Sequence, residues 1–201
     1  MGGAALCYES AAMSLEIVAS SFLLVAASEM GDKTQLLAFS LATRYRRPWT
    51  ILAGVLVATT LNHALASSAG RWISTEVPPR LLAGLLAVTF VGFGLWTLKP
   101  DTLEEARGPD RFGPFVTTAV LFFLAEMGDK TQLATVALAA RFGSVVLVTV
   151  GSTLGMLAAD GLAIFAGDRL AERIPMVWLR RGAATLFLVF GLASAWTALV
   201  G

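Results

Sequence analysis

The segment EMGDKTQL occurs twice in this chain, over residues 29–36 and again over residues 126–133. Each copy places two carboxylates, one lysine and one side-chain amide in a stretch that is otherwise apolar. Carboxylate and amide oxygens without a cluster of cysteines are hard ligands, which suit magnesium, calcium or manganese. The two copies predict a divalent-cation site, with the candidate ligands Glu29, Asp32, Gln35, Glu126, Asp129 and Gln132.

The sequence around both motifs is that of a membrane protein. Hydrophobic residues make up 56% of the 201 residues and charged residues only 14%, and the net charge of +1 implies no nucleic-acid partner. A helix needs ~20 residues to cross the hydrocarbon core of a bilayer. Stretches of about this length cover residues 48–70, 81–98, 142–167 and 182–201, and residues 17–43 and 115–140 complete a set of six if the motifs lie near mid-membrane. We expect an all-α integral membrane protein with six transmembrane helices, whose oligomeric state the sequence does not define.

The chain contains an internal repeat. A shift of 97 residues aligns Glu29 with Glu126 and His63 with Asp160, while the third helices align after a slip to 100. We expect an N-terminal tail over residues 1–13, a three-helix repeat over 14–98, a cytoplasmic linker over 99–113 and a second three-helix repeat over 114–201. Because three crossings are an odd number, the second repeat is inverted. Inverted repeats place a binding site at mid-membrane and rock to give alternating access.

On a continuous helix, the charged residues of each motif would share one face. The glutamate, the aspartate and the lysine fall at positions i, i+3 and i+4, so glutamate and lysine can pair within one turn. Lys33 and Lys130 would then balance charge and leave a surplus of two negative charges. Since each ionisable residue costs ~2.5–3.5 kcal/mol at the bilayer centre, a divalent cation is the expected partner of that surplus.

Smaller residues are expected to support this arrangement. Gly31 and Gly128 permit close backbone approach or local unwinding, and Thr34 and Thr131 add neutral oxygens. Further glycines within the apolar stretches predict close helix packing. These are Gly84, Gly92, Gly94, Gly151 and Gly155.

Crowded acids also predict coupling to protons. Four carboxylates in a medium of low dielectric cannot all be ionised unless a cation is bound. Metal entry then expels protons and proton entry expels metal, so a site that holds one or the other while the halves rock is an antiporter. Asp160 and His63 are candidate proton relays, because each lies alone within an apolar stretch. For His63 an interhelical hydrogen bond is an equal alternative, and a direct contact with the ion would favour manganese.

Basic residues predict the orientation in the membrane. Ten lie after the first, third and fifth helices and three after the second and fourth. The ten are Arg44, Arg46, Arg47, Lys99, Arg107, Arg111, Arg169, Arg173, Arg180 and Arg181, and the three are Arg71, Arg80 and Arg141. Because basic residues accumulate on the cytoplasmic side, both termini are expected outside the cell (inner) membrane.

Both motif copies resemble the duplicated signature E-x-G-D-[KR]-[TS] of uncharacterised protein family 0016, also called the Gdt1 or transmembrane protein 165 family. The resemblance covers nearly the whole chain, since six helices in two halves form that family's core. Members are regarded as cation/proton exchangers that move manganese or calcium, and bacterial members are associated with manganese export. The resemblance implies that the functional acids are Glu29, Asp32, Glu126 and Asp129, and that Mn²⁺ or Ca²⁺ is transported without a further cofactor.

Two other classes of protein stay open at this point. In an intramembrane aspartyl protease, Asp32 and Asp129 would share a proton and activate water. The first glycine of the Gly-x-Gly-Asp motif of such enzymes is a glutamate here, however, and the Tyr-Asp partner is missing. An exporter of small cationic organic solutes such as amino acids is the other alternative, although a doubled motif without an aromatic cage favours a small spherical ion. We expect a transporter and not an enzyme.

Overall fold

The computed structural model describes residues 2–99, 112–166 and 176–200, and within these ranges it contains helices and no strands. The helices are α1 (Gly2–Glu29), α2 (Lys33–Tyr45), α3 (Pro48–Glu76), α4 (Pro79–Thr97), α5 (Gly113–Glu126), α6 (Lys130–Phe142), α7 (Val145–Ala166) and α9 (Met176–Val200). Five of them, α1, α3, α4, α7 and α9, are long and apolar enough to cross a membrane. The prediction of an all-α, multi-pass membrane protein is therefore confirmed.

Local chemistry explains where several helices begin and end. Proline occupies the first turn of α3, α4 and α5, where its missing N–H costs no intrahelical hydrogen bond. Gly143 ends α6 in the left-handed conformation, with φ of 66°, and Arg46 ends α2 in the same way. The helix α1 begins at Gly2, so residues 2–13 of the expected tail are helical. The predicted linker lies largely outside the described residues, as do Arg169 and Arg173.

Both motifs interrupt a helix. The chain leaves α1 at Glu29 and enters α2 at Lys33, and it leaves α5 at Glu126 and enters α6 at Lys130. The expectation of one continuous helix over residues 17–43 and another over residues 115–140 was wrong. The shared helix face was wrong for the same reason, because glutamate and aspartate lie on opposite sides of the break. Local unwinding at the motif glycines is confirmed, since Gly31 has a φ of 82° and Gly128 a φ of 80°.

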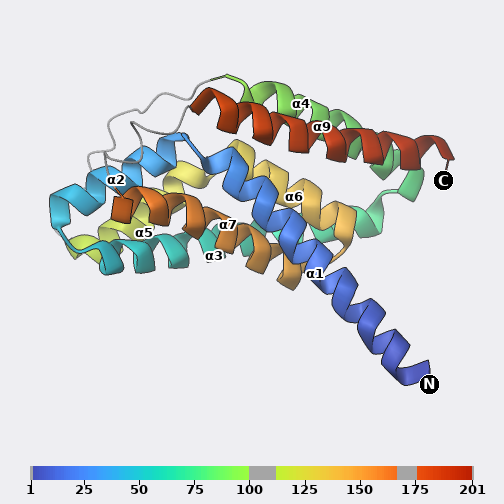
Figure 1. Cartoon of the computed structure of the whole chain (residues 1–201), viewed down its shortest axis with the longest axis horizontal. Coiled ribbons are helices and arrows are strands. Elements are labelled where there is room, and N and C mark those ends of the chain that lie inside the picture. Colours follow the sequence, from blue (N-terminus) through green and yellow to red (C-terminus); the bar gives the residue numbers. More distant parts are fainter. Residues whose placement is uncertain (1, 100–111, 167–175, 201) are drawn as a thin grey trace.

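Two long helices organise the core. The helix α3 packs against α7, α5 and α6 pack against α3, and α1 and α2 pack against α7 (Figure 1). The pair α4 and α9 lies along one side of this group. In Figure 1, α1 and α2 run from right to left and α5 and α6 run from left to right, while the N- and C-termini both lie towards the right. The two interrupted segments therefore run in opposite directions through one body.

Glycines allow several of these helices to touch. A Cβ atom at Gly54 would lie 2.9 Å from the carbonyl oxygen of Phe115, and one at Gly151 would lie 2.5 Å from that of Val18. Close packing was correctly predicted for Gly94, Gly151 and Gly155, whose added Cβ atoms would lie 3.2, 2.5 and 2.6 Å from backbone oxygens of neighbouring helices. It was wrong for Gly84 and Gly92, which have nothing within 4 Å.

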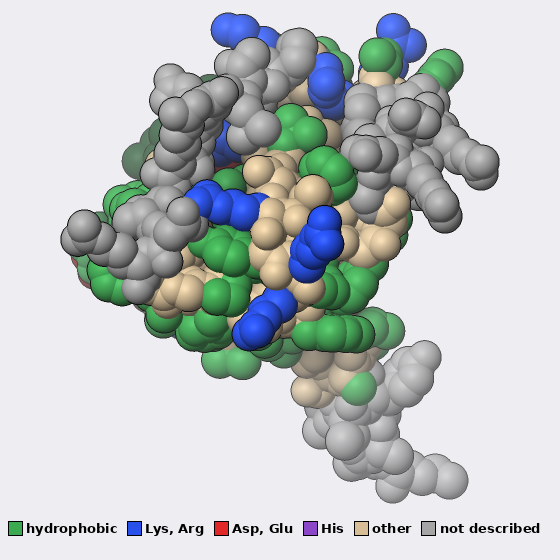
Figure 2. Space-filling model, turned by 90° about the vertical axis from the view of Figure 1, so that its left-hand side faces the viewer, with side chains coloured by type: hydrophobic (Ala, Val, Ile, Leu, Met, Phe, Trp, Pro, Cys, Tyr) green, Lys and Arg blue, Asp and Glu red, His purple; other side chains and the backbone are tan. Residues whose placement is uncertain are grey.

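One end of the molecule carries exposed basic side chains. Figure 2 looks onto the left-hand end of Figure 1, where Lys and Arg side chains stand among apolar ones. The end of α2, the end of α4 and the beginning of α9 lie at this end (Figure 1). These helix ends carry the basic residues Arg44, Arg46, Lys99 and Arg181, which are all exposed.

The packing at Gly151 predicts the effect of a single methyl group. Gly151→Ala should lower the free energy of unfolding by ~1–3 kcal/mol, because the added methyl overpacks against the backbone of α1, which cannot swing away as a side chain can. Gly84→Ala is the matched control and should be neutral or slightly stabilising, because alanine favours a helix by up to ~1 kcal/mol where space is open. Thermal unfolding in detergent measures both, and equal effects at the two positions would contradict this packing.

Candidate metal centre

The two aspartates cap the helices that follow the breaks. Asp32 Oδ1 accepts a hydrogen bond from the backbone N–H of Lys33 at 2.8 Å, and Asp129 Oδ1 accepts one from Lys130 at 2.6 Å. An aspartate at this position satisfies a backbone donor that a helix start leaves open, and the positive end of the helix dipole favours its charge. The breaks therefore position one carboxylate at the start of α2 and one at the start of α6.

The two glutamines stabilise the turns. Gln35 Oε1 accepts a hydrogen bond from the N–H of Gly31 at 2.9 Å, and Gln132 Oε1 accepts one from Gly128 at 2.7 Å. Their amide nitrogens reach across to other helices, to the carbonyl oxygen of Ala159 at 3.0 Å for Gln35. The motifs predict both glutamines as cation ligands, but in this structure their side-chain oxygens accept hydrogen bonds from the motif backbone.

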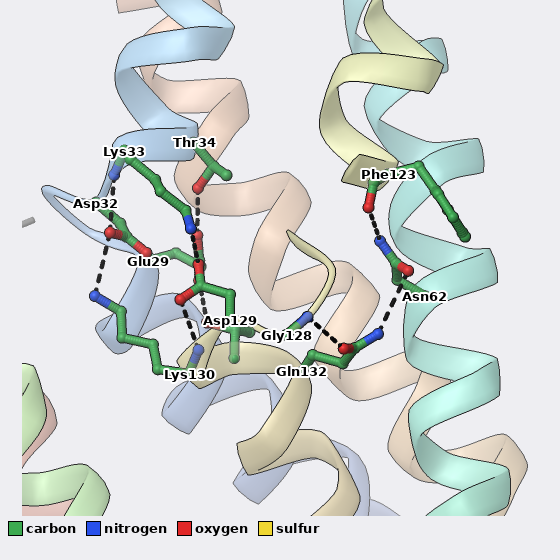
Figure 3. Close-up of polar contacts among 11 residues, drawn as sticks. Glu29, Asp32, Lys33, Thr34, Asn62, Phe123, Gly128, Asp129, Lys130 and Gln132 are labelled. Atoms are coloured by element: carbon green, nitrogen blue, oxygen red, sulfur yellow. Dashed lines mark hydrogen bonds and ion pairs between the residues drawn. The ribbon is translucent and has the colours of Figure 1, made fainter. Parts of the chain in front are cut away.

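Gln132 contacts Asn62, a residue that the motifs alone do not predict as part of the site. Its Nε2 lies 3.5 Å from Asn62 Oδ1, and Asn62 donates in turn to the carbonyl oxygen of Phe123 at 3.0 Å (Figure 3). The 97-residue shift provides a signal, because it aligns Gln132 with Gln35 and Asn62 with Ala159, which is the partner of Gln35. Asn62 is polar and lies inside an apolar stretch, at the position that the repeat assigns to the partner of the motif glutamine.

The lysines pair with the opposite motif. Lys33 Nζ lies 3.1 Å from Asp129 Oδ2, and Lys130 Nζ lies 3.2 Å from Asp32 Oδ1 (Figure 3). The predicted pairs of glutamate and lysine within one turn are therefore replaced by crossed pairs of aspartate and lysine. The physical reason is the break, which removes the i, i+4 geometry on which the prediction rested.

The glutamates have unequal surroundings. Thr34 donates to Glu29 Oε2 at 2.6 Å (Figure 3). Thr131 from the other motif donates to Glu29 Oε1. Both carboxylate oxygens of Glu126, in contrast, are buried without a hydrogen-bond partner among the described residues. The two motifs are thus alike in their breaks, caps and ion pairs, but they differ at the glutamates.

The centre is dry and strongly acidic. Glu29, Glu126 and Asp160 are fully buried, and Asp32 is 1% exposed. Glu126 is repelled by the charges of Glu29, Asp129, Asp160 and Asp32, so the acids of both motifs lie within electrostatic range of one another. Burial without compensation is costly for any carboxylate. The arrangement therefore favours binding of a positive charge, either a proton or a cation.

The two candidate relays differ in their relation to these acids. Asp160 on α7 is buried, its oxygens have no hydrogen-bond partner among the described residues, and it is electrostatically coupled to Glu29 and Glu126. His63 on α3 is equally buried, and both its ring nitrogens also have no hydrogen-bond partner in the described part of the chain. The coupling to the motif acids distinguishes Asp160.

The acids do not form a finished metal site in this conformation. Within residues 2–99, 112–166 and 176–200, no three side chains among His, Cys, Asp and Glu are placed to bind one ion together. The two ammonium groups lie on the aspartates instead. Carboxylate oxygens are hard ligands, and those of the two aspartates are paired with lysines in this structure.

Comparison with known proteins gives a consistent result. A family model described as "Divalent cation/proton antiporter GDT1" matches residues 17–105 and 114–201. A protein of Vibrio cholerae named "Putative manganese exporter" is 41% identical over 90% of this chain and 91% of its own length. A GDT1-like protein of Synechocystis is 32% identical over 89% of this chain and 96% of its own, and one of Oryza sativa subsp. indica is 29% identical over 87% and 71%. No solved structure matches.

The left-handed turn at Gly128 leads to a prediction about stability. Gly128→Ala should lower the free energy of unfolding by ~1–2 kcal/mol, the cost of an L-residue in this conformation. Gly128→Asn should cost less, because asparagine tolerates positive φ. An added Cβ would meet nothing within 4 Å here, so the effect isolates backbone strain.

The control for this pair is Gly182→Ala, at a helical glycine that also has open space around it. It should not lower stability. Thermal unfolding of the purified variants in detergent makes the comparison, and an alanine at residue 128 that is tolerated as well as asparagine would argue against the turn.

Proposed function

This chain belongs to the GDT1 family of divalent cation/proton antiporters, and on that premise we propose that it exports Mn²⁺ in exchange for protons by alternating access. The family is one of transporters, so the protein transports ions and is not an enzyme. Neither the aspartyl protease nor the exporter of organic cations has support from the comparisons. Manganese is the proposed cargo because of the name of the Vibrio cholerae relative, and Ca²⁺ is the alternative that fits the same oxygen ligands.

The observation that carries this proposal is the meeting of the two motifs in the buried core. The proposed ligands are the four carboxylates Glu29, Asp32, Glu126 and Asp129, because Mn²⁺ and Ca²⁺ prefer oxygen donors. The crossed ion pairs hold the two aspartates at the seam between the motifs. Gln35 and Gln132 support the turns that present these acids, and Thr34 and Thr131 orient Glu29.

We further propose that the chain consists of two inverted three-helix repeats, over residues 14–98 and 114–201. Support comes from pairs of contacts that obey the same 97-residue shift. Gly54 meets Phe115 as Gly151 meets Val18, and the two ion pairs are related in the same way. The opposite directions of the two interrupted segments agree with inversion (Figure 1). Rocking of one repeat against the other would expose the shared acids to each side in turn.

Proton exchange is assigned to the carboxylates that have no hydrogen-bond partner among the described residues. Glu126, which is also a proposed ligand, and Asp160 are both buried, and their negative charges repel one another. When the cation leaves, protons can neutralise these acids, and when it returns, it displaces the protons. We propose Asp160 as the relay in preference to His63, because Asp160 is coupled to Glu29 and Glu126.

The basic end of the molecule is proposed to face the cytoplasm. The exposed arginines and lysine at the ends of α2, α4 and α9 meet the positive-inside rule in this orientation. Both termini would then lie outside the cell (inner) membrane, since they lie at the other end (Figure 1). Export moves Mn²⁺ away from the basic end and protons towards it.

Transport in proteoliposomes tests the proposed function. Proteoliposomes with an acidic interior should accumulate Mn²⁺, because protons that leave down their gradient drive Mn²⁺ in the opposite direction. Asp32→Asn and Asp129→Asn should each reduce exchange at least tenfold, because each removes a charged ligand. Glu76→Gln is the matched control, since it neutralises an exposed carboxylate at the end of α3, and it should exchange normally.

Mn²⁺ flux without opposing proton movement would refute antiport, and intact flux in either aspartate variant would refute the site. Ca²⁺ tested in parallel separates the two cargoes.

The relay can be tested apart from the ligands. Asp160→Asn should release fewer protons for each Mn²⁺ bound and lose proton-driven exchange, while Mn²⁺ still binds. His63→Gln is the comparison variant and should keep both, because we assign His63 no part in the proton exchange. Proton release on Mn²⁺ addition, followed with a pH indicator in weakly buffered detergent solution, measures the difference. A normal proton yield from Asp160→Asn would exclude Asp160 from the exchange.

A further inference from the structure

The crossed ion pairs occupy oxygens that a bound cation would need. Each ammonium group lies within 3.2 Å of a carboxylate oxygen of Asp32 or Asp129. Divalent cations bind carboxylate oxygens at ~2.0–2.6 Å, so an ion that bridged the two aspartates would lie beside both ammonium groups. Like charges at such short range in a dry site repel strongly. An ion bound between the motifs and lysines seated on the aspartates therefore exclude one another.

The stability of the fold does not by itself explain one buried and one partly buried lysine at this place. A buried ion pair gains little over well-packed apolar residues, because both charges lose their hydration. Each lysine also follows its own aspartate directly, yet it pairs with the aspartate of the opposite motif. The pairing therefore places each positive charge at the seam between the two motifs, where the cargo is proposed to bind.

One divalent ion carries the same charge as the two ammonium groups that it would displace from the aspartates. Asp32, Asp129, Lys33 and Lys130 together form a neutral group. A divalent ion that displaces both ammonium groups leaves the two aspartates neutralised, whereas a monovalent ion leaves one negative charge uncompensated in a dry core. Competition with the two lysines therefore favours binding of a doubly charged ion over binding of a singly charged one.

We infer that Lys33 and Lys130 are tethered counter-cations, which neutralise the two aspartates in the empty transporter and which the divalent cargo displaces. They are specificity-determining residues, because they act against monovalent ions by competing for the same carboxylates. This inference rests on the proposed function, since it takes Asp32 and Asp129 as ligands of the cargo.

The two lysines differ in how tightly they hold their partners. The side chain of Lys33 is 32% exposed, whereas that of Lys130 is 5% exposed. Lys130 and Asp32 line a small crevice together with Lys99 and Arg180. Because solvent screens the Lys130 pair less, Lys130 competes with the cargo more strongly than Lys33 does.

Release of the lysines can be observed directly on the whole protein. Purified protein in detergent is treated with an amine-reactive acetylating reagent with and without saturating Mn²⁺, and mass spectrometry measures the modification of each lysine. Lys130 should react several-fold faster when Mn²⁺ is bound, and Lys33 should change less because it is already partly exposed. Removal of Mn²⁺ with a chelator is the control, and it should return the reactivity of Lys130 to its original value. Mn²⁺ binding that leaves both motif lysines as unreactive as before would overturn the inference.

Substitution gives a second, independent measurement. Lys130→Met should lower the Kd for Mn²⁺ about tenfold, equivalent to ~1.4 kcal/mol, because the competitor is gone. It should also allow Na⁺ to inhibit Mn²⁺ binding, whereas Lys130→Arg should keep the wild-type resistance to Na⁺. If Lys130 had only a structural role, Lys130→Met would bind Mn²⁺ more weakly and Na⁺ would not compete. That result would also overturn the inference. If the wild-type protein binds no Mn²⁺, the proposed function fails and this inference fails with it, whereas Mn²⁺ binding without lysine release removes this inference alone.

Discussion

The need to neutralise carboxylates inside a low-dielectric core governs the rest of this structure. Several acids are buried at the centre of an apolar helical body, and none of them can be ionised there without a nearby positive charge. Two aspartates meet this need with backbone amides and lysines, and Glu29 meets it in part with two hydroxyl groups. Glu126 and Asp160 have no such hydrogen-bond partners among the described residues. The neutralisation is therefore incomplete, which is the condition that a carrier of cations and protons requires.

The broken helices make this partial neutralisation geometrically possible. A continuous helix would bond its own backbone amides and would point the acids of one motif along one face. A break creates a new helix start, whose free amide and dipole orient an aspartate towards the opposite motif. The left-handed glycine at each break lets the chain reverse its local twist without strain. The same break also frees each lysine from its own helix neighbours, so that it can reach across the seam.

The sequence alone predicted much of this organisation. The duplicated motif, the apolar stretches and the motif glycines correctly indicated an all-helical membrane protein with unwinding at Gly31 and Gly128. The ion pairs could not be predicted, because the pairing of Glu29 with Lys33 assumed an unbroken helix. The role of Gln35 in the turn was missed for the same reason. The unequal surroundings of Glu29 and Glu126 are invisible in two identical octapeptides, because they depend on the conformation in which the two halves meet and not on local sequence.

The crossed pairing also has a consequence for biosynthesis. Asp32 and Lys33 leave the ribosome long before Asp129 and Lys130, so their partners do not yet exist when the first helices reach the translocon. Until the second motif arrives, the first must hold its charges in water or pair them temporarily within its own turn. Membrane integration of the first half therefore becomes fully favourable only when the second half joins it. The crossed pairs thus link the two halves of the chain energetically, because neither aspartate has its lysine partner until both motifs are present.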